Sequence, residues 1–195
     1  VVAPLDGGAR ALPVGGVRPA GREDARPRRT AAVLVGVLDQ PEPEIVLTRR
    51  SERLALHAGQ VSLPGGAAME SDPTGVLTAL REAEEEIGLS RRNVELLGRL
   101  GSCRTITNFH VTPVVGRIRQ PFSPVPDPRE VAHVFTIPLT WLADPANVER
   151  RDRLLPGRNG VAIDVLYFQQ YRGELLWGVT ARLVAALVAG ISKVG

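Results

Sequence analysis

The sequence predicts a single mixed α/β domain, and three observations lead to this prediction. β-Branched apolar runs at residues 30–38 and 109–118 predict buried strands. Apolar residues at helical spacing predict two long helices, at about 72–87 and 176–194. Several strands follow one another without a helix between them, so the order is not the strict alternation of a doubly wound sheet. A chain of 195 residues is long enough for one well-buried domain and short for two.

The other predicted strands are shorter and are bounded by turn residues. Residues 44–49 follow a Gln-Pro-Glu-Pro turn and are expected to form a hairpin with residues 30–38. Further strands are expected at residues 61–63, 94–104, 130–137 and 160–169, with a short helix at 138–142 and a charged loop, with room for a short strand, at 144–159.

The first long helix has predictable ends. Asp72 is expected to be its N-cap, with Pro73 at the first helical position. The helix is expected to end near Ile87, where Gly88 supplies a positive-φ stop. The apolar residues Val76, Leu80, Ala83 and Ile87 share one side of the helix, which is therefore expected to be buried.

The opposite side of this helix concentrates negative charge. Glu82, Glu85 and Glu86 lie within one arc of roughly a quarter turn, whereas Glu84 projects away from it. Like charges at this spacing repel, so the cluster disfavours the helix unless a positive charge lies over it. Mg²⁺ binds carboxylate and carbonyl oxygens and often bridges to phosphates. The pattern therefore indicates a divalent-metal site, with a solvated acidic face as the simpler interpretation.

The excess positive charge of the chain lies at its start. Residues 1–29 hold six Arg and three acidic residues, and the remaining 166 residues hold 18 basic and 18 acidic ones. Residues 1–28 are rich in Pro, Gly and Arg and are expected to form a flexible leader before a domain at 29–195. An aromatic content of 4% is low for a base-stacking platform, so no nucleic-acid partner is expected.

The sequence also gives expectations for the compartment. It contains no apolar run of membrane-spanning length, and its start lacks the apolar core of a signal peptide. Cys103 is the only cysteine, which suits a reducing compartment. We therefore expect a cytoplasmic protein without membrane contact. Cys103 has no His/Asn partner pattern and is rejected as a nucleophile.

Residues 66–89 resemble the signature of the Nudix family. That signature reads Gly, five residues, Glu, seven residues, then Arg-Glu-apolar-any-Glu-Glu-any-Gly-apolar. Its second half is complete here, from Arg81 to Leu89. In the first half, Asp72 stands where the family has Glu, and eight residues separate it from Arg81. The added residue is similar to what the coenzyme A pyrophosphatase branch of the family shows.

The segment before the signature also resembles that branch. The branch pattern is Leu-Thr-x-Arg-Ser, Leu, His-x-Gly-Gln, Phe-Pro-Gly-Gly, and residues 47–66 match it except for Leu63 in place of Phe. Further similarity lies at residues 108–115, 130–135 and 177–182, so the resemblance spans about residues 30–190.

The resemblance implies a fold and a metal site. The fold would be the Nudix fold, a mixed β-sheet sandwiched between helices. Glu82 and Glu86 would bind Mg²⁺ or Mn²⁺ with Glu85, and the carbonyl of Gly65 would complete the set. Arg81 is expected to pair with a Glu side chain and orient it, with phosphate contact as the alternative. Either Glu85 or Glu130 is expected to take the proton from water, and the sequence does not decide between them. An equal interpretation of Glu130 is a surface residue at the start of a strand.

The branch pattern also implies substrate-binding residues. Arg50, His57, Gln60 and Gly66 are the candidates, and the simpler interpretation of His57 and Gln60 is that they hydrogen-bond the turn. A guanidinium matches the geometry of a phosphate, so Arg49 and Arg50 are candidates to clamp one. Neighbours on a strand alternate in direction, so one of the two is expected to point away. Arg50 occupies the arginine position of the branch pattern, so Arg50 is the one expected to bind phosphate.

The resemblance implies a metal-dependent diphosphatase that cleaves coenzyme A, or an acyl or oxidised derivative, to 3′,5′-ADP and the (acyl) phosphopantetheine. One alternative is a Nudix hydrolase of another nucleoside diphosphate, such as ADP-ribose or a nucleotide sugar. Another is a Nudix-like ligand sensor without catalysis, which the acidic cluster disfavours because a sensor does not need charges that destabilise a helix. The oligomeric state is open, with a homodimer as one option.

Overall fold

The computed structural model describes residues 29–105, 107–154 and 162–191 and is built around strand β1 (Arg29–Leu38). The predicted leader, residues 1–28, lies outside the described residues. β1 pairs antiparallel with β2 (Glu44–Arg50), which confirms the predicted hairpin. On its other side β1 pairs parallel with β7 (Phe109–Ile118) along its whole length.

Five further strands complete the main sheet or extend it at its edges. They are β3 (Val61–Ser62), β4 (Gly65–Ala67), β5 (Val94–Arg99), β6 (Cys103–Arg104) and β8 (Val131–Pro138) around β1, β2 and β7. The resulting eight-stranded sheet has the order β3-β2-β1-β7-β5, with β4 paired to β1, β6 to β7 and β8 to β2. It is a mixed sheet, because the β1–β7 pair is parallel and the other pairs are antiparallel.

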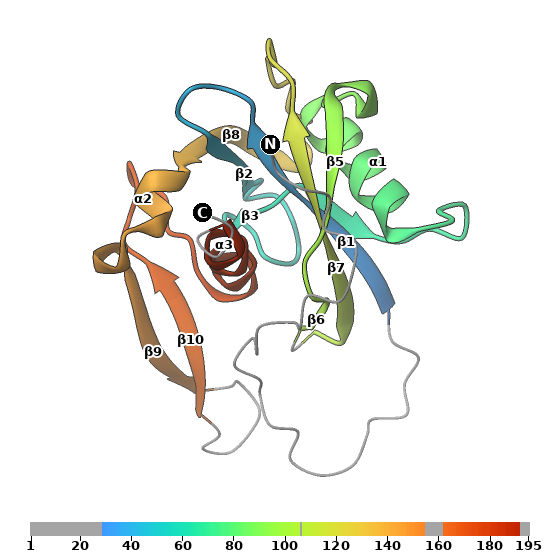
Figure 1. Ribbon diagram of the computed structural model, residues 1–195. Coiled ribbons are helices and arrows are strands. Elements are labelled where there is room, and N and C mark those ends of the chain that lie inside the picture. The colour runs from blue at the N-terminus through green and yellow to red at the C-terminus, as the bar shows by residue number, and fades with distance from the viewer. Residues whose placement is uncertain (1–28, 106, 155–161, 192–195) are drawn as a thin grey trace.

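Helices cover both faces of the sheet. Successive residues of a strand point to opposite faces, so Leu34 and Val35 of β1 enter different apolar cores. Leu34 packs in a core with buried residues of helix α1 (Gly75–Ile87), and Val35 packs in a core with those of helix α3 (Gly178–Ile191). Figure 1 shows α1 in green on one side of the sheet and α3 in red on the other. The predicted fold class, a mixed sheet between helices, is confirmed.

The N-terminal end of α1 differs from the prediction. The N-cap is Thr74, whose hydroxyl accepts a hydrogen bond from the Leu77 N–H at 3.3 Å, and not Asp72. Asp72 forms an ion pair with Arg81 instead, and the hydroxyl of Thr74 caps the helix. The C-terminal end is as predicted, since Gly88 has φ +69° and its N–H bonds the last turn.

Two predicted strands also differ in extent. The strand expected at residues 94–104 is divided into β5 and β6. The Leu100 N–H still bonds the Pro113 carbonyl, but proline has no N–H to donate in return, and the register on β7 has shifted by one residue where β6 begins at Cys103. The strand expected from Glu130 begins one residue later, because the Glu130 N–H closes a turn onto the carbonyl of Asp127.

A second, smaller sheet lies apart from the main one. Its strands are β9 (Val148–Leu154) and β10 (Ala162–Phe168), which pair antiparallel. β9 lies within the segment predicted to be a charged loop, residues 144–159, where a short strand was allowed for. The short elements beside these sheets are α2 (Leu139–Ala143), η1 (Arg91–Asn93) and η2 (Pro145–Asn147). In the described part of the chain, no helix is long and apolar enough to cross a membrane.

Candidate metal and diphosphate site

The candidate site begins where the Pro-Gly-Gly loop meets α1. Gly65 and Gly66 lie in β4, which pairs with β1 and passes beside the helix. Gly65 has φ +154°, and a Cβ on it would lie 2.4 Å from the Ala32 carbonyl oxygen. A Cβ on Gly66 would lie 2.5 Å from the carboxylate of Glu82. Gly65 therefore lets β4 lie close against β1, and Gly66 lets the Glu82 carboxylate of α1 approach the backbone of β4.

Glu86 is the most buried acidic residue of this site. It is 2% exposed, and its carboxylate accepts a hydrogen bond from the Gly65 N–H at 3.1 Å. The Arg50 guanidinium lies 3.6 Å away on its other side. Burial raises the pKa of Glu86 to about 7, although the Gly65 N–H and Arg50 oppose that rise. The site therefore holds a carboxylate whose charge is costly unless a cation lies nearby.

Glu82 and Glu130 belong electrostatically to the same site. Burial raises the pKa of Glu82, and the adjacent Arg81 opposes the rise only in part. The negative charge of Glu130 raises the pKa of both Glu82 and Glu86. Glu130 is exposed in the turn before β8, and its carbonyl accepts the N–H of Ser51 at 2.8 Å. Glu130 is therefore an exposed carboxylate whose charge acts on Glu82 and Glu86, whereas Glu86 itself is buried.

Arg81 binds three carboxylates at once. Its Nε and Nη2 donate to the two oxygens of Asp72 at 3.2 and 2.9 Å, and its Nη1 lies 3.0 Å from Glu82 and 2.9 Å from Glu85. Nη2 also donates to the Ala67 carbonyl at 3.2 Å. The expectation that Arg81 pairs with Glu side chains agrees with this geometry. Sequence reasoning missed Asp72 as its partner.

Glu85 is placed differently from the other two glutamates. Its side chain is 54% exposed and turns toward Arg81, whereas Glu86 is buried against Gly65 and Arg50. Among the described residues, no three His, Cys, Asp or Glu side chains converge into a closed metal-binding group. The three glutamate side chains, expected to share one arc of the helix surface, therefore do not all point into the same place. Glu85 lies at the exposed edge of the site, where Arg81 binds it.

The donor set nevertheless fits a hard divalent cation in its chemistry. Glu82 and Glu86 are carboxylates, partly or fully buried, whose pKa values are raised first by burial and then by neighbouring carboxylates. The Gly66 position leaves room for the Glu82 carboxylate. Oxygen ligands of this kind, together with a backbone carbonyl, are those that Mg²⁺ and Mn²⁺ take in proteins. A bound cation would favour the charged forms of both carboxylates, which burial and neighbouring negative charge otherwise disfavour.

The loop before β3 is joined to the site by its backbone. The Arg50 N–H donates to the Gln60 carbonyl at 2.9 Å, which closes residues 51–59 into a loop. Within it, His57 Nδ1 and the Gln60 Oε1 atom lie 3.0 Å apart, and His57 has φ +57°. His57 and Gln60 therefore hydrogen-bond each other, as the simpler interpretation expected, and the His57 side chain is exposed beside the site.

Arg49 and Arg50 point in different directions, as their alternation on β2 requires. Arg50 reaches Glu86 on the α1 side. Arg49 instead pairs with Glu174 at 3.3 Å and with Glu52 at 3.5 Å. His133 Nε2 lies 2.8 Å from the second oxygen of Glu174. Glu174 and His133 carried no signal in the sequence, because their partners lie far away along the chain.

Cys103 is a half-buried thiol in β6. Burial raises its pKa, which keeps it in the unreactive protonated form. The local environment therefore agrees with its rejection as a nucleophile.

Comparison with known proteins gives a consistent result. A family model described as the NUDIX domain matches residues 27–157. The chain is 38% identical over 164 residues to an uncharacterized Nudix hydrolase, NudL, of Yersinia pestis (strain Pestoides F), covering 84% of this chain and 80% of the relative. It has the same identity and coverage to NudL of Yersinia pseudotuberculosis serotype O:1b (strain IP 31758).

Solved structures agree on the fold. A Nudix hydrolase from M. Smegmatis, RenU, superposes with a TM-score of 0.57 at 19% identity, covering 86% of this chain and 88% of that one. A MutT/nudix family protein from Enterococcus faecalis superposes with a TM-score of 0.53 at 13% identity, covering 90% of this chain and 65% of that one. At these identities the likeness concerns the fold alone.

Proposed function

Because the chain belongs to the Nudix hydrolase family and is a pyrophosphohydrolase, we propose that its substrate is coenzyme A or an acyl derivative. The reaction adds water across the diphosphate and yields 3′,5′-ADP and the (acyl) phosphopantetheine. The proposal rests on the branch-specific segment at residues 47–66 and on how that segment meets the acidic helix.

The observation that carries the proposal is the contact between Arg50 and Glu86. Their side chains lie 3.6 Å apart, although one belongs to β2 and the other to α1. The Arg50 Nε atom is buried without a hydrogen-bond partner among the described residues. A buried N–H without an acceptor is costly, and the planar guanidinium suits a phosphate oxygen. The Arg50 side chain as a whole is 23% exposed, so Arg50 combines a contact to the acidic site with a guanidinium that a phosphate group can reach.

The acidic residues would hold the metal and the water. Glu82 and Glu86, with the Gly65 carbonyl, would hold Mg²⁺ or Mn²⁺, which neutralises the diphosphate and lowers the pKa of bound water when present. Arg81 holds Glu85 and Glu82 in place through its contacts to both. Arg50 would bind a phosphate oxygen, and Gly66 would let the substrate approach the backbone.

Of the two candidate bases, the geometry favours Glu130. The Glu85 carboxylate is engaged by the Arg81 guanidinium at 2.9 Å, which competes with water for its oxygens. Glu130 is exposed, and its charge acts on both Glu82 and Glu86. A general base has to be within reach of the attacking water, and an exposed carboxylate beside the cluster meets that requirement.

A substrate panel tests the proposal. The chain is incubated with Mg²⁺ or Mn²⁺ and coenzyme A, acetyl coenzyme A, ADP-ribose or a nucleotide sugar, and the products are identified by chromatography and mass spectrometry. We expect 3′,5′-ADP from the coenzyme A compounds. Dephospho-coenzyme A, which lacks the 3′-phosphate, shows whether that group contributes to binding. Turnover of ADP-ribose with none of coenzyme A under any metal would overturn the substrate and leave the hydrolase assignment intact.

A further inference from the structure

Strand β9 presents an open sheet edge on the side of the molecule away from the carboxylate site. β10 is anchored in the core next to α3 through buried residues such as Leu166 and Phe168. β9 projects outward, and its residues 150–154 are exposed. Within the described residues β9 pairs only with β10, so its outer backbone groups have no strand partner. A two-stranded sheet with one open edge is a template for a further strand.

We propose that β9 pairs antiparallel with β9 of a second copy of this chain, across a two-fold axis at Arg151. The two small sheets then become one four-stranded sheet that spans both protomers. A two-fold contact is self-complementary, so each residue must suit the residue that the symmetry places opposite it. The sequence of β9, Val-Glu-Arg-Arg-Asp-Arg-Leu, meets this requirement at every position except the central Arg151.

The charges of β9 match under this symmetry. Pairing about Arg151 places Glu149 opposite Arg153 of the second copy, and Arg150 opposite Asp152. Each of these pairs occurs twice in the dimer. Opposite charges directly across an antiparallel pair stabilise it, and like charges destabilise it. A shift of the centre by one residue to Asp152 would instead place Arg151 against Arg153 and Asp152 against itself, so the charge pattern favours Arg151 over Asp152 as the centre.

The central Arg151 is the one position where like charges meet. Its guanidinium lies 4.8 Å from the centre of its own Tyr167 ring and forms an ion pair with its own Glu149. Arg153 is held in the same manner, 4.5 Å from the centre of the Trp177 ring. The Tyr167 and Trp177 rings stack at 5.7 Å. These contacts hold both guanidiniums flat on the sheet surface and lower the cost of the central pair.

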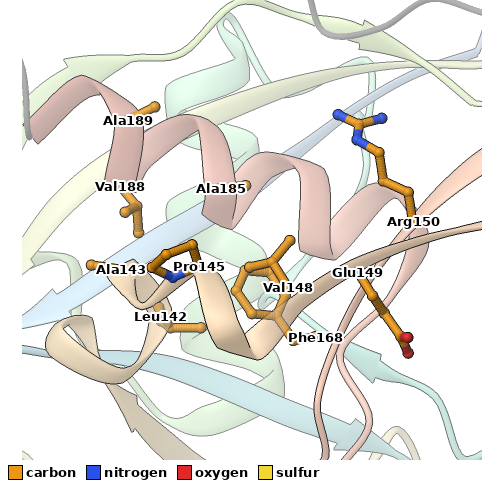
Figure 2. A pocket seen from close by; sticks show the side chains of 10 residues that line it. All are labelled: Leu142, Ala143, Pro145, Val148, Glu149, Arg150, Phe168, Ala185, Val188 and Ala189. Atoms are coloured by element: carbon orange, nitrogen blue, oxygen red, sulfur yellow. The ribbon is translucent and has the colours of Figure 1, made fainter.

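An apolar hollow beside β9 fits the end of the second strand. The hollow has a volume of about 530 Å³, and Val148, Phe168 and Val188 line it, with Glu149 and Arg150 at one side (Figure 2). The proposed register places Leu154 of the second copy opposite Val148, on the face of the strand that lines this hollow. Leu154 is 67% exposed in the single chain. The pairing therefore covers an exposed apolar side chain and an exposed apolar hollow together.

A charge-swap series tests the proposed dimer. Sedimentation velocity is run on the full chain over a range of micromolar concentrations, and circular dichroism checks that each variant is folded. We expect a dimer for the unmodified chain. Glu149→Arg should raise the dimer dissociation constant roughly tenfold or more, because two attractive contacts become repulsive. Adding Arg153→Glu to the same chain should restore the dimer, since the exchange reinstates both opposite-charge pairs.

Glu95→Arg is the matched control, because Glu95 lies on β5, an edge strand of the main sheet, with its side chain 46% exposed. It should leave the dimer unchanged. A monomer for the unmodified chain at every concentration would overturn the proposal. So would a folded Glu149→Arg variant that stays dimeric, or a double variant that fails to recover. Loss of the dimer in Glu95→Arg alone would move the contact to β5.

Discussion

Asp72 and Arg81 form a two-point ion pair across the loop that leads into α1. Arg81 Nε and Nη2 donate to the two carboxylate oxygens of Asp72 at 3.2 and 2.9 Å. The Met69 N–H donates to the same carboxylate at 3.0 Å and secures the loop. With two of its donors fixed in this way, Arg81 presents Nη1 to Glu82 and Glu85. Asp72 thus orients the acidic site without contacting it.

We predict that Asp72→Asn lowers turnover about tenfold or more, because an amide cannot hold both guanidinium donors and the orientation of Glu82 and Glu85 is lost. The metal concentration for half-maximal activity should rise with it. Steady-state kinetics at varied Mg²⁺ measure both quantities. Glu70→Gln, at an exposed position of the same loop, serves as the control and should behave as the unmodified chain. An unchanged metal requirement in Asp72→Asn would show that Arg81 keeps its position without Asp72.

A second prediction concerns stability at low pH. The Arg81 guanidinium lowers the pKa of Asp72 to about 2, and the Arg129 guanidinium lowers that of Asp127 to about 2. A carboxyl group with a depressed folded-state pKa stabilises the fold above its unfolded pKa, and that stability is lost as the pH falls toward the folded value. The free energy of unfolding should therefore fall between about pH 4 and about pH 2. Urea unfolding across this range should show a shallower fall in Asp72→Asn, and an identical slope would refute the contribution of Asp72.

A third prediction addresses the buried carboxylate. Glu86→Gln should lower kcat roughly 100-fold or more, since a ligand charge at the reacting centre is lost. The fold should survive, because the amide oxygen of Gln can still accept the Gly65 N–H and a costly buried charge is removed. Glu84→Gln, on the exposed side of the same helix, is the matched control and should retain the full rate. Glu86 would be excluded as a ligand if its folded variant kept most of the activity.

The identity of the general base gives a fourth prediction. Glu130→Gln should flatten the acidic limb of the pH–rate profile and lower kcat about 100-fold or more. Glu85→Gln should also be slower, yet keep the acidic limb, since Glu85 is engaged by Arg81. The pH dependence of kcat at saturating substrate separates the two. An acidic limb that disappears in Glu85→Gln and persists in Glu130→Gln would reverse the assignment.

The fifth prediction is that deletion of residues 1–28 leaves kcat, KM and the unfolding midpoint unchanged. The described site is built from residues of β1, β2, β4 and α1, together with Glu130, all of which follow residue 28. The truncated and full chains are compared in the coenzyme A assay and by thermal unfolding. A large rise in KM with an unchanged midpoint would show that the leader contacts the substrate.

Local patterns were sufficient for most of the elements. The strand at Phe109–Ile118 is found at its predicted bounds, because its β-branched apolar residues suit the buried, pleated surface of a sheet. The Gly88 stop is likewise a local property, since glycine adopts positive φ without a steric cost. The predicted start of the helix was wrong because the Asp72 carboxylate binds Arg81 and is not available to cap the helix.

The sequence by itself determined the acidic helix, since residue spacing decides which glutamates share a face and helical geometry depends on near neighbours only. It also determined the family resemblance of residues 47–89. Tertiary structure alone decided which arginine meets which carboxylate. Arg50 reaches Glu86 because the register of β1 and β2 brings β2 beside α1, and Arg81 separates Glu85 from Glu86 through its hold on Asp72. Arg50 and Glu86 are far apart in the chain, and such a long-range contact depends on packing that no local pattern encodes.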